Sequence, residues 1–125
     1  MQPIGIIHSP FTEKSQIPSQ STKAPDVKAY IELFPKFQKG SLGLKAGQKI
    51  LIIFGFHQNK RADLQTIPKH SNKLKGIFAT RSPHRPNFLG VSVVKLDRIE
   101  SNKLHFSGCD MMEGSPVWDI KPYIK

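Results

Sequence analysis

The sequence lacks the features that would place it outside a cell or in a membrane. It has a single cysteine, Cys109, among 125 residues, so no disulfide can form within the chain, which fits a reducing compartment. Its longest apolar run, Ile50 to Phe56, is far shorter than the roughly 20 apolar residues of a transmembrane helix. The first residues show neither a basic segment nor a cleavage site, so we expect no signal peptide. These absences predict a cytoplasmic protein without a membrane partner.

Motifs of several large enzyme classes are missing as well. The chain contains no GxGxxG sequence, no P-loop, no HExxH and no nucleophile elbow. Its five histidines are scattered, and neither they nor the lone cysteine have the spacing of a zinc site. We therefore expect no metal site, and the pattern argues against a dinucleotide-dependent enzyme on a doubly wound sheet.

Acidic residues are scarce. Nine Asp and Glu stand against 19 Lys and Arg, which gives a formal net charge of +10. An excess of this size favours a polyanionic partner, with nucleic acid first. The alternative is a solvated basic surface that keeps a small protein soluble, and charge alone does not decide between the two. The 38% of hydrophobic residues suffices for a compact fold, and we expect residues 1–125 to form one domain.

The apolar runs that are present are short and rich in Ile, Val and Phe, which is typical of strands. We expect a mainly β fold with little helix, in which six or seven strands close into a small barrel without exposed edges. The strand at 49–59 has almost no polar residue, so we expect both of its faces to be buried. The expected strands are Ile4–Phe11, Lys28–Phe34, Lys49–Asn59, Gly76–Arg81, a hairpin within Val91–Met111 that turns at Ser101 and Asn102, and Ser115–Lys125, with one short helical turn within Lys36–Leu44.

One long segment, Gln58 to Lys75, has neither helical nor strand periodicity and is rich in Lys and Arg. Long loops in compact domains are usually functional or disordered. We interpret this segment as a long basic loop.

The stretch "FATRSPHRPNFLG", Phe78 to Gly90, is too long and too specialised for a plain turn. Its two prolines fix φ and stiffen the loop, which lowers the entropy lost when side chains bind a ligand. Arg81 and Arg85 offer planar forks for carboxylate or phosphate, Asn87 offers an amide for a base edge, and Gly90 would allow a close approach. We favour a ligand site over a surface loop with paired arginines.

A second cluster is "DMMEGSPVWDIKPY", Asp110 to Tyr123. Met111 and Met112 would ordinarily fill gaps in a core, but they could also pack against a purine face. The carboxylates of Asp110 and Glu113 would attract a cationic ligand, and a sulfonium is such a cation.

A third cluster, "HQN", covers His57 to Asn59 and follows the most apolar strand. A histidine and two amides at a strand end can hydrogen-bond a ligand or cap the strand, and the spacing does not separate these roles.

The three clusters together resemble the TsaA-like family, which includes the TrmO-type tRNA adenosine N6-methyltransferases. The similarity rests on "IGIIHSPFTEKSQIPSQ", "IELFPKFQKGSLGL", "FGFHQN", "GIFATRSPHRPNFLGVSVVKL" and "GCDMMEGSPVWDIKPYIK", which span nearly the whole chain. The chain reads "RPNFLG" and "EGSPV" where the family usually reads "RPNPIG" and "DGTPV". The resemblance implies a small β-barrel, a homodimer and binding of S-adenosylmethionine, with threonylcarbamoyl-adenosine beside the tRNA anticodon as the methyl acceptor.

The resemblance also implies a set of site residues. Arg81 would bind the carboxylate of the methionine moiety, and the turn at Met111 would line the adenine or the sulfonium. Arg85 and Asn87 would face the modified base, and Asp110 would orient or deprotonate the attacking nitrogen, which makes these three the expected catalytic residues. The expected cofactor-binding residues are Pro18, Ser19, Gln20, His57, Gln58, Arg81, Asp110, Met111, Met112 and Glu113.

The resemblance leaves the substrate less secure than the cofactor. Several members carry an added C-terminal domain that helps to bind tRNA, and we expect the basic loop 58–75 to do that work here. The alternatives are a methyltransferase acting on another substrate, a non-catalytic S-adenosylmethionine-binding RNA module, and a basic barrel that only binds RNA.

Overall fold

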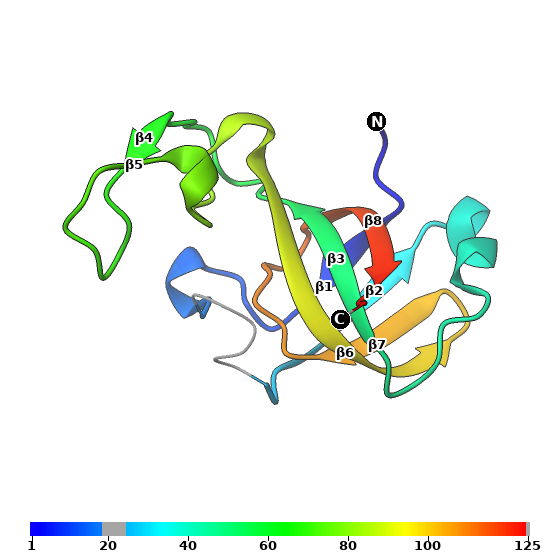
Figure 1. The fold of residues 1–125 in the computed structure, drawn as a ribbon. Coiled ribbons are helices and arrows are strands. Elements are labelled where there is room, and N and C mark those ends of the chain that lie inside the picture. Colours follow the sequence, from blue (N-terminus) through cyan, green and yellow to red (C-terminus); the bar gives the residue numbers. More distant parts are fainter. Residues whose placement is uncertain (19–24, 125) are drawn as a thin grey trace.

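Six strands form the body of the protein. The structure is a computed structural model that describes residues 1–18 and 25–124 (Figure 1). The mainly β character is confirmed, and the helical segments among the described residues are short 3-10 turns. The elements are β1 (Gly5–His8), η1 (Lys14–Gln16), β2 (Lys28–Leu33), η3 (Pro35–Ser41), β3 (Lys49–Gly55), β4 (Gln65–Thr66), β5 (Lys75–Gly76), η4 (Ile77–Ala79), η5 (Pro86–Phe88), β6 (Leu89–Glu100), β7 (Lys103–Ser107) and β8 (Pro116–Pro122).

The strands pair in the order β1-β2-β7-β6-β3-β8, and β8 returns to β1, so that the pairing describes a closed barrel. All of these pairs are antiparallel. The seam between β1 and β8 is short, since only Gly5 with Val117 and Ile6 with Pro116 are in register. Gly5 is required in this region because a Cβ there would lie 2.5 Å from the main-chain oxygen of Glu32 on β2.

The core lies inside the barrel and follows from strand alternation, because successive side chains point to opposite faces. On β3, Ile50, Ile52 and Phe54 face inward and are buried. The expectation that both faces of this strand are buried is wrong, because Leu51 and Ile53 face outward and are partly exposed. The core residues are Ile7, Ala29, Ile31, Leu33, Ile50, Ile52, Phe54, Val94, Leu96, Leu104, Phe106, Cys109, Met111 and Val117.

The hairpin of β6 and β7 turns at the expected place, with Ser101 in the left-handed region at a φ of 57°. The expected strand at 76–81 is wrong. Only Lys75 and Gly76 pair with β4, and the chain then forms the 3-10 turn η4, in which Ile77 is 1% exposed and Phe78 is 79% exposed. A single buried side chain at this point cannot make the alternating face that a strand needs.

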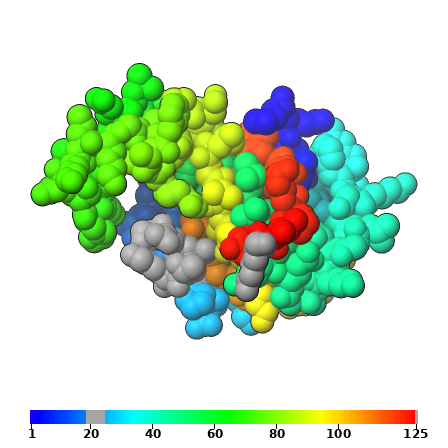
Figure 2. All heavy atoms as spheres, viewed as in Figure 1, coloured from blue at the N-terminus to red at the C-terminus, as the bar shows by residue number. Residues whose placement is uncertain are grey.

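The segment between His57 and Thr80 extends away from the barrel, and Figure 2 shows it as a projection from the compact body. We call residues 58–79 the arm. It contains β4 and β5, which form a separate two-stranded sheet. In the part of the chain that the structure describes, no helix is long and apolar enough to cross a membrane.

Candidate functional site

Two segments that the sequence singles out flank one end of the barrel. We call residues 81–90 the bend and residues 109–116 the corner. The bend leads into β6 and the corner leads into β8, and both strands pair with β3, whose last residues precede His57. The side chain of Asp110 in the corner accepts a hydrogen bond from Ser92 on β6 at 2.7 Å, so the corner is tied to the strand that follows the bend.

The bend owes its shape to its second proline. Asn87 lies at φ 66° and ψ −6°, and the amide of Phe88 donates to the carbonyl of Arg85 at 3.1 Å. Proline followed by a residue of positive φ is typical of a type II turn, and Asn tolerates that conformation better than most residues. The carbonyl of Phe88 then accepts from the amide of Phe56, which fixes the turn against the end of β3.

Both arginines of the bend bind main-chain carbonyls. Arg85 donates through Nη1 to the carbonyl of Thr80 at 2.8 Å and more weakly to that of Ser82 at 3.4 Å. Arg81 donates through Nη2 to the carbonyl of Val91 at 2.9 Å. The guanidinium groups therefore hold the loop in shape, and Arg81 is the more exposed of the two.

Gly90 has a different role from the one expected for it. A Cβ at this position would lie 2.7 Å from the ring of Phe54 and 2.7 Å from the ring of Phe56. These two rings meet edge to face with centroids 5.0 Å apart. Gly90 thus makes room for an aromatic pair.

A pocket of about 270 Å³ opens between the end of β3, the bend and the start of β8. Two of the expected site residues, His57 and Asn87, line it together. The imidazole of His57 also lies beside the corner, 3.6 Å from where a Cβ of Gly114 would be. We call this the aromatic pocket; its lining is Gly55, Phe56, His57, Asn59, Asn87, Phe88, Pro116 and Trp118.

The aromatic pocket can hold a flat, partly polar ring. Phe56, Phe88 and Trp118 offer apolar faces, and the amides of Asn59 and Asn87 can both donate and accept. Partial burial lowers the pKa of His57, so its imidazole is more fully neutral at pH 7 than an ordinary histidine and can accept a proton or a hydrogen bond.

The two methionines of the corner point into the protein. Met111 is 1% exposed and belongs to the core, and Met112 is 7% exposed. Neither lines the aromatic pocket. Between them and β7, Cys109 is fully buried, and burial raises the pKa of its thiol to about 11, so it is no nucleophile at neutral pH.

The carboxylate of Glu113 is engaged on the other side of the corner. Its Oε1 accepts from the amide of Ser9 at 3.0 Å, and its Oε2 accepts from Nδ1 of His8 at 2.9 Å. Nε2 of His8 in turn donates to Glu32 at 2.8 Å. Both ring nitrogens can donate at once only in the imidazolium form. Burial alone would lower the pKa of His8, but the hydrogen bonds to Glu32 and Glu113 and their negative charges outweigh it and raise that pKa.

His8 and Glu113 border a second pocket of about 400 Å³, which we call the histidine pocket. Its lining is His8, Ser9, Pro10, Lys28, Ala29, Tyr30 and Glu113. The ring of Tyr30 lies 4.9 Å from that of His8 and 5.3 Å from that of His105, so a short row of rings crosses β1, β2 and β7. Among the described residues, no group of three His, Cys, Asp or Glu side chains is arranged to hold a metal ion.

The expected site residues are therefore brought only partly together. His57 and Asn87 share the aromatic pocket, Glu113 lies in the histidine pocket, and Asp110 binds Ser92. Gln58 is exposed at the start of the arm, Pro18 ends a described segment, and Ser19 and Gln20 lie outside the described residues.

Sequence reasoning gave no site role to His8, Phe56 or Trp118. The sequence did contain a signal for His8. Side chains alternate along the strand, so if Ile7 faces the core, His8 must face outward, where it can contact other polar groups. No local signal marks Trp118, since its place over Gly55 depends on the pairing of β3 with β8.

Fold and site together define a small, mainly β domain with a pocket lined by aromatic side chains at one end of its sheet. The chain belongs to the family described as tRNA-methyltransferase O N-terminal domain, whose model matches residues 6–125.

Named relatives cover almost the whole chain. A "Probable S-adenosyl-L-methionine-binding protein" of Pyrococcus abyssi is 41% identical over 98% of this chain and 67% of its own length. A "tRNA (adenine(37)-N6)-methyltransferase" of Homo sapiens is 35% identical over 98% of this chain and 30% of its own length. The crystal structure of TrmO from Pseudomonas aeruginosa superposes with a TM-score of 0.83 at 40% identity, over 98% of this chain and 54% of that one. The chain thus spans only part of the length of these relatives.

Proposed function

We propose that residues 1–125 form one S-adenosylmethionine-binding domain that transfers a methyl group to N6 of an adenosine in tRNA. The acceptor we propose is the threonylcarbamoyl-adenosine beside the anticodon. Family membership over residues 6–125 and the relatives named as S-adenosylmethionine-dependent or tRNA methyltransferases support this activity.

The observation that carries the proposal is the aromatic pocket, where an expected cofactor-binding residue, His57, and an expected base-facing residue, Asn87, line one cavity. Both the cofactor and the acceptor contain an adenine ring, and such a ring can stack on Trp118 or Phe56 while its edge meets an amide. The volume of about 270 Å³ lies near the lower limit for ligand pockets, which suits one base rather than a whole cofactor.

The cofactor would supply an electrophilic methyl group on a sulfonium. The residues proposed to hold it are the expected set, including Ser19 and Gln20, which lie outside the described residues. Within that set, the buried Met111 acts by fixing the corner. Oγ of Ser9 donates a hydrogen bond to the main-chain carbonyl of Met111 at 2.7 Å. Arg81, exposed beside Val91, offers the charge for a carboxylate.

On the acceptor side, Asn87 is placed to read a base edge, and Arg85 keeps the bend rigid through its two carbonyl contacts. Asp110 is the proposed group that orients the attacking nitrogen and accepts its proton, with Ser92 fixing the carboxylate. The S–CH3 bond breaks as the N6–CH3 bond forms, so the protein mainly aligns the two partners, which can lower the barrier by several kcal/mol, up to about 10.

We further propose that the protein acts in the cytoplasm as a homodimer. Support comes from an apolar strip on the outside of the barrel, where Leu51 opposes Val93 and Ile53 opposes Val91 in register. These four side chains are partly exposed, and contiguous apolar surface of this kind often marks an interface. Sedimentation equilibrium would test this, and a mass of one chain at micromolar concentration would contradict it.

Labelled S-adenosylmethionine, incubated with the protein and with tRNA that does or does not carry the threonylcarbamoyl group, tests the activity. Nucleoside mass spectrometry should find one added methyl only on the threonylcarbamoylated tRNA. A bound cofactor without any methylated product would indicate a non-catalytic binding module. A methyl group on another acceptor would support the proposed methyltransferase activity but contradict the proposed acceptor.

A further inference from the structure

We propose that the arm, residues 58–79, is a tRNA-docking element whose lysines contact backbone phosphates and whose Phe78 stacks on an unpaired base. The inference rests on the proposed function, because it assumes that the substrate is RNA. It adds the surface that holds the RNA and the residues that do so.

Charge is the first argument. The arm carries five basic residues and one acidic residue, a net charge of +4 within a chain of +10. The acidic residue, Asp63, is already paired with Arg61 at 3.3 Å. Lys69, Lys73 and Lys75 are exposed, and contacts of Lys and Arg with phosphates supply nearly all of the sequence-independent affinity of proteins for nucleic acid.

Position is the second argument. The arm leaves the body directly after His57, and only Thr80 separates its returning end from Arg81, so both of its ends lie close to expected site residues. The amide of Asp63 donates to the carbonyl of His84 at 2.9 Å, which ties the arm to the bend. The side chain of Ile77, 1% exposed, anchors its returning end. RNA held by the arm would therefore lie beside the bend and the aromatic pocket.

The exposed ring of Phe78 is the third argument. Phe78 is 79% exposed, and only Ala79 and Thr80 separate it from the bend. An aromatic ring in such a position can stack on an unpaired base of any identity, as anticodon-loop bases allow.

A second copy of the chain is the competing occupant, because Leu64, Ile67 and Leu74 of the arm are also exposed. Charge disfavours contact between two arms, because each arm carries the same +4 and the two would repel one another. A polyanion has the complementary sign, and we therefore assign the surface to RNA.

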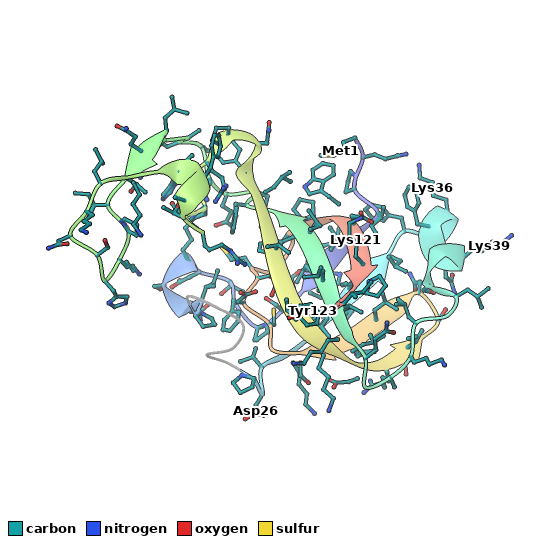
Figure 3. All side chains as sticks on the ribbon, in the orientation of Figure 1. Met1, Asp26, Lys36, Lys39, Lys121 and Tyr123 are labelled. Atoms are coloured by element: carbon teal, nitrogen blue, oxygen red, sulfur yellow. The ribbon has the colours of Figure 1, made fainter. Side chains whose placement is uncertain are left out.

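The test compares two triple variants of the full chain in tRNA binding by fluorescence anisotropy at several salt concentrations. The arm variant is K69Q/K73Q/K75Q. The matched control, K39Q/K45Q/K49Q, removes the same charge from η3 and from the chain that leads into β3; Figure 3 shows Lys39 on the opposite side of the body from the arm.

The arm variant should bind tRNA about tenfold more weakly at moderate salt, and the slope of log K against log[salt] should fall in magnitude by about 2 to 3. The control should change both quantities far less. Equal losses in the two variants would show that net charge and not the arm matters, and would overturn the proposal.

Phe78→Ala tests the stacking contact, with Leu42→Ala as its control because Leu42 is 95% exposed on the η3 side. Phe78→Ala should weaken tRNA binding about fivefold or more with an unchanged salt slope, and Leu42→Ala should not. A change in sedimentation mass with unchanged tRNA affinity would assign Phe78 to contact with a second copy and overturn its role here.

The experiments distinguish a failure of the proposed function from a failure of the role assigned to the arm. If the wild-type protein neither binds tRNA nor methylates it, the proposed function falls. If it does both, and the arm variant does both equally well with the same S-adenosylmethionine affinity, only the arm assignment falls.

Discussion

At the scale of single residues, one glycine, Gly90, and one asparagine, Asn87, determine the shape of the site. Gly90 lies under two phenylalanine rings, and Asn87 holds a left-handed backbone at the rim of the aromatic pocket. Neither role involves a charged group, so both can be tested by substitution with glycine or alanine.

Gly90→Ala should lower the free energy of unfolding by about 1 to 3 kcal/mol, because its Cβ would overlap the rings of Phe54 and Phe56. Urea denaturation followed by circular dichroism measures this. Gly76→Ala is the control, since a Cβ there meets nothing within 4 Å and φ is −63°. Similar losses in both variants would show that the ring contact is not the cause.

Asn87→Gly should leave stability nearly unchanged, because glycine adopts a φ of 66° without strain, and should reduce methyl transfer by removing the amide. Asn87→Ala should lose activity and also about 1 kcal/mol of stability, because alanine is strained in the left-handed region. Melting temperature and turnover, measured on the same preparations, separate the two effects. Full activity in Asn87→Gly would exclude a role for the side chain.

At the scale of elements, one histidine links the corner to both β1 and β2, in addition to the hydrogen bonds that the corner makes with residues 7–11. His8 faces Glu32 on β2 and Glu113 in the corner, with Tyr30 beside its ring and Lys28 in the same pocket. His8 thus bridges Glu32 and Glu113, and this bridge is ionic only while the imidazole is protonated.

This bridge predicts a pH dependence. Because the pKa of His8 is raised in the folded protein, its contribution is fully present below the ordinary value of 6.5 and is lost as pH rises through the raised pKa. Wild type should therefore exceed His8→Gln in stability by more at pH 6 than at pH 8.5. The difference should be at most about 1 kcal/mol, since Glu32 and Glu113 are 47% and 40% exposed.

Thermal melts of wild type and His8→Gln across this pH range would show the effect as a difference that shrinks with rising pH. A difference that grows with pH would mean that the histidine is bound as the neutral form. Glu113→Gln should abolish much of the same pH-dependent difference, because it removes one of the two charges.

The sequence predicts the strands of the barrel well and the contacts of the site poorly, and the reason is physical. Alternation along Lys28–Leu33 and Lys103–Ser107 is a local property that follows from one buried face. The partners of Arg85 and Arg81 are main-chain carbonyls, which leave no trace in residue identity. Met111 is buried in the core because the corner folds back over the barrel, and no local pattern in the sequence indicates this.

At the scale of the whole molecule, closure of the sheet rests on its shortest seam. Two residue pairs join β1 to β8, and one of them includes Pro116, which has no amide hydrogen to donate. By contrast, β3 pairs over Lys49–Gly55 with β6 and over Ile50–Phe54 with β8.

Native-state hydrogen exchange should therefore open this seam first. The amides of Ile4 and Ile7, which donate to Val117 and Ser115 across it, should exchange faster than those of Ile50 to Phe54. Nuclear magnetic resonance can follow each amide. Equal protection at both places would show that the barrel opens only as one cooperative unit.

Trp118 is the only tryptophan in the chain, and it stands in the wall of the aromatic pocket. Its indole emission therefore arises from that cavity alone, without background from a second fluorophore of the same kind. An adenine ring that entered beside it would change this signal directly. The unlabelled protein thus contains its own optical probe of occupancy, with which ligand titrations and rapid-mixing traces can be recorded.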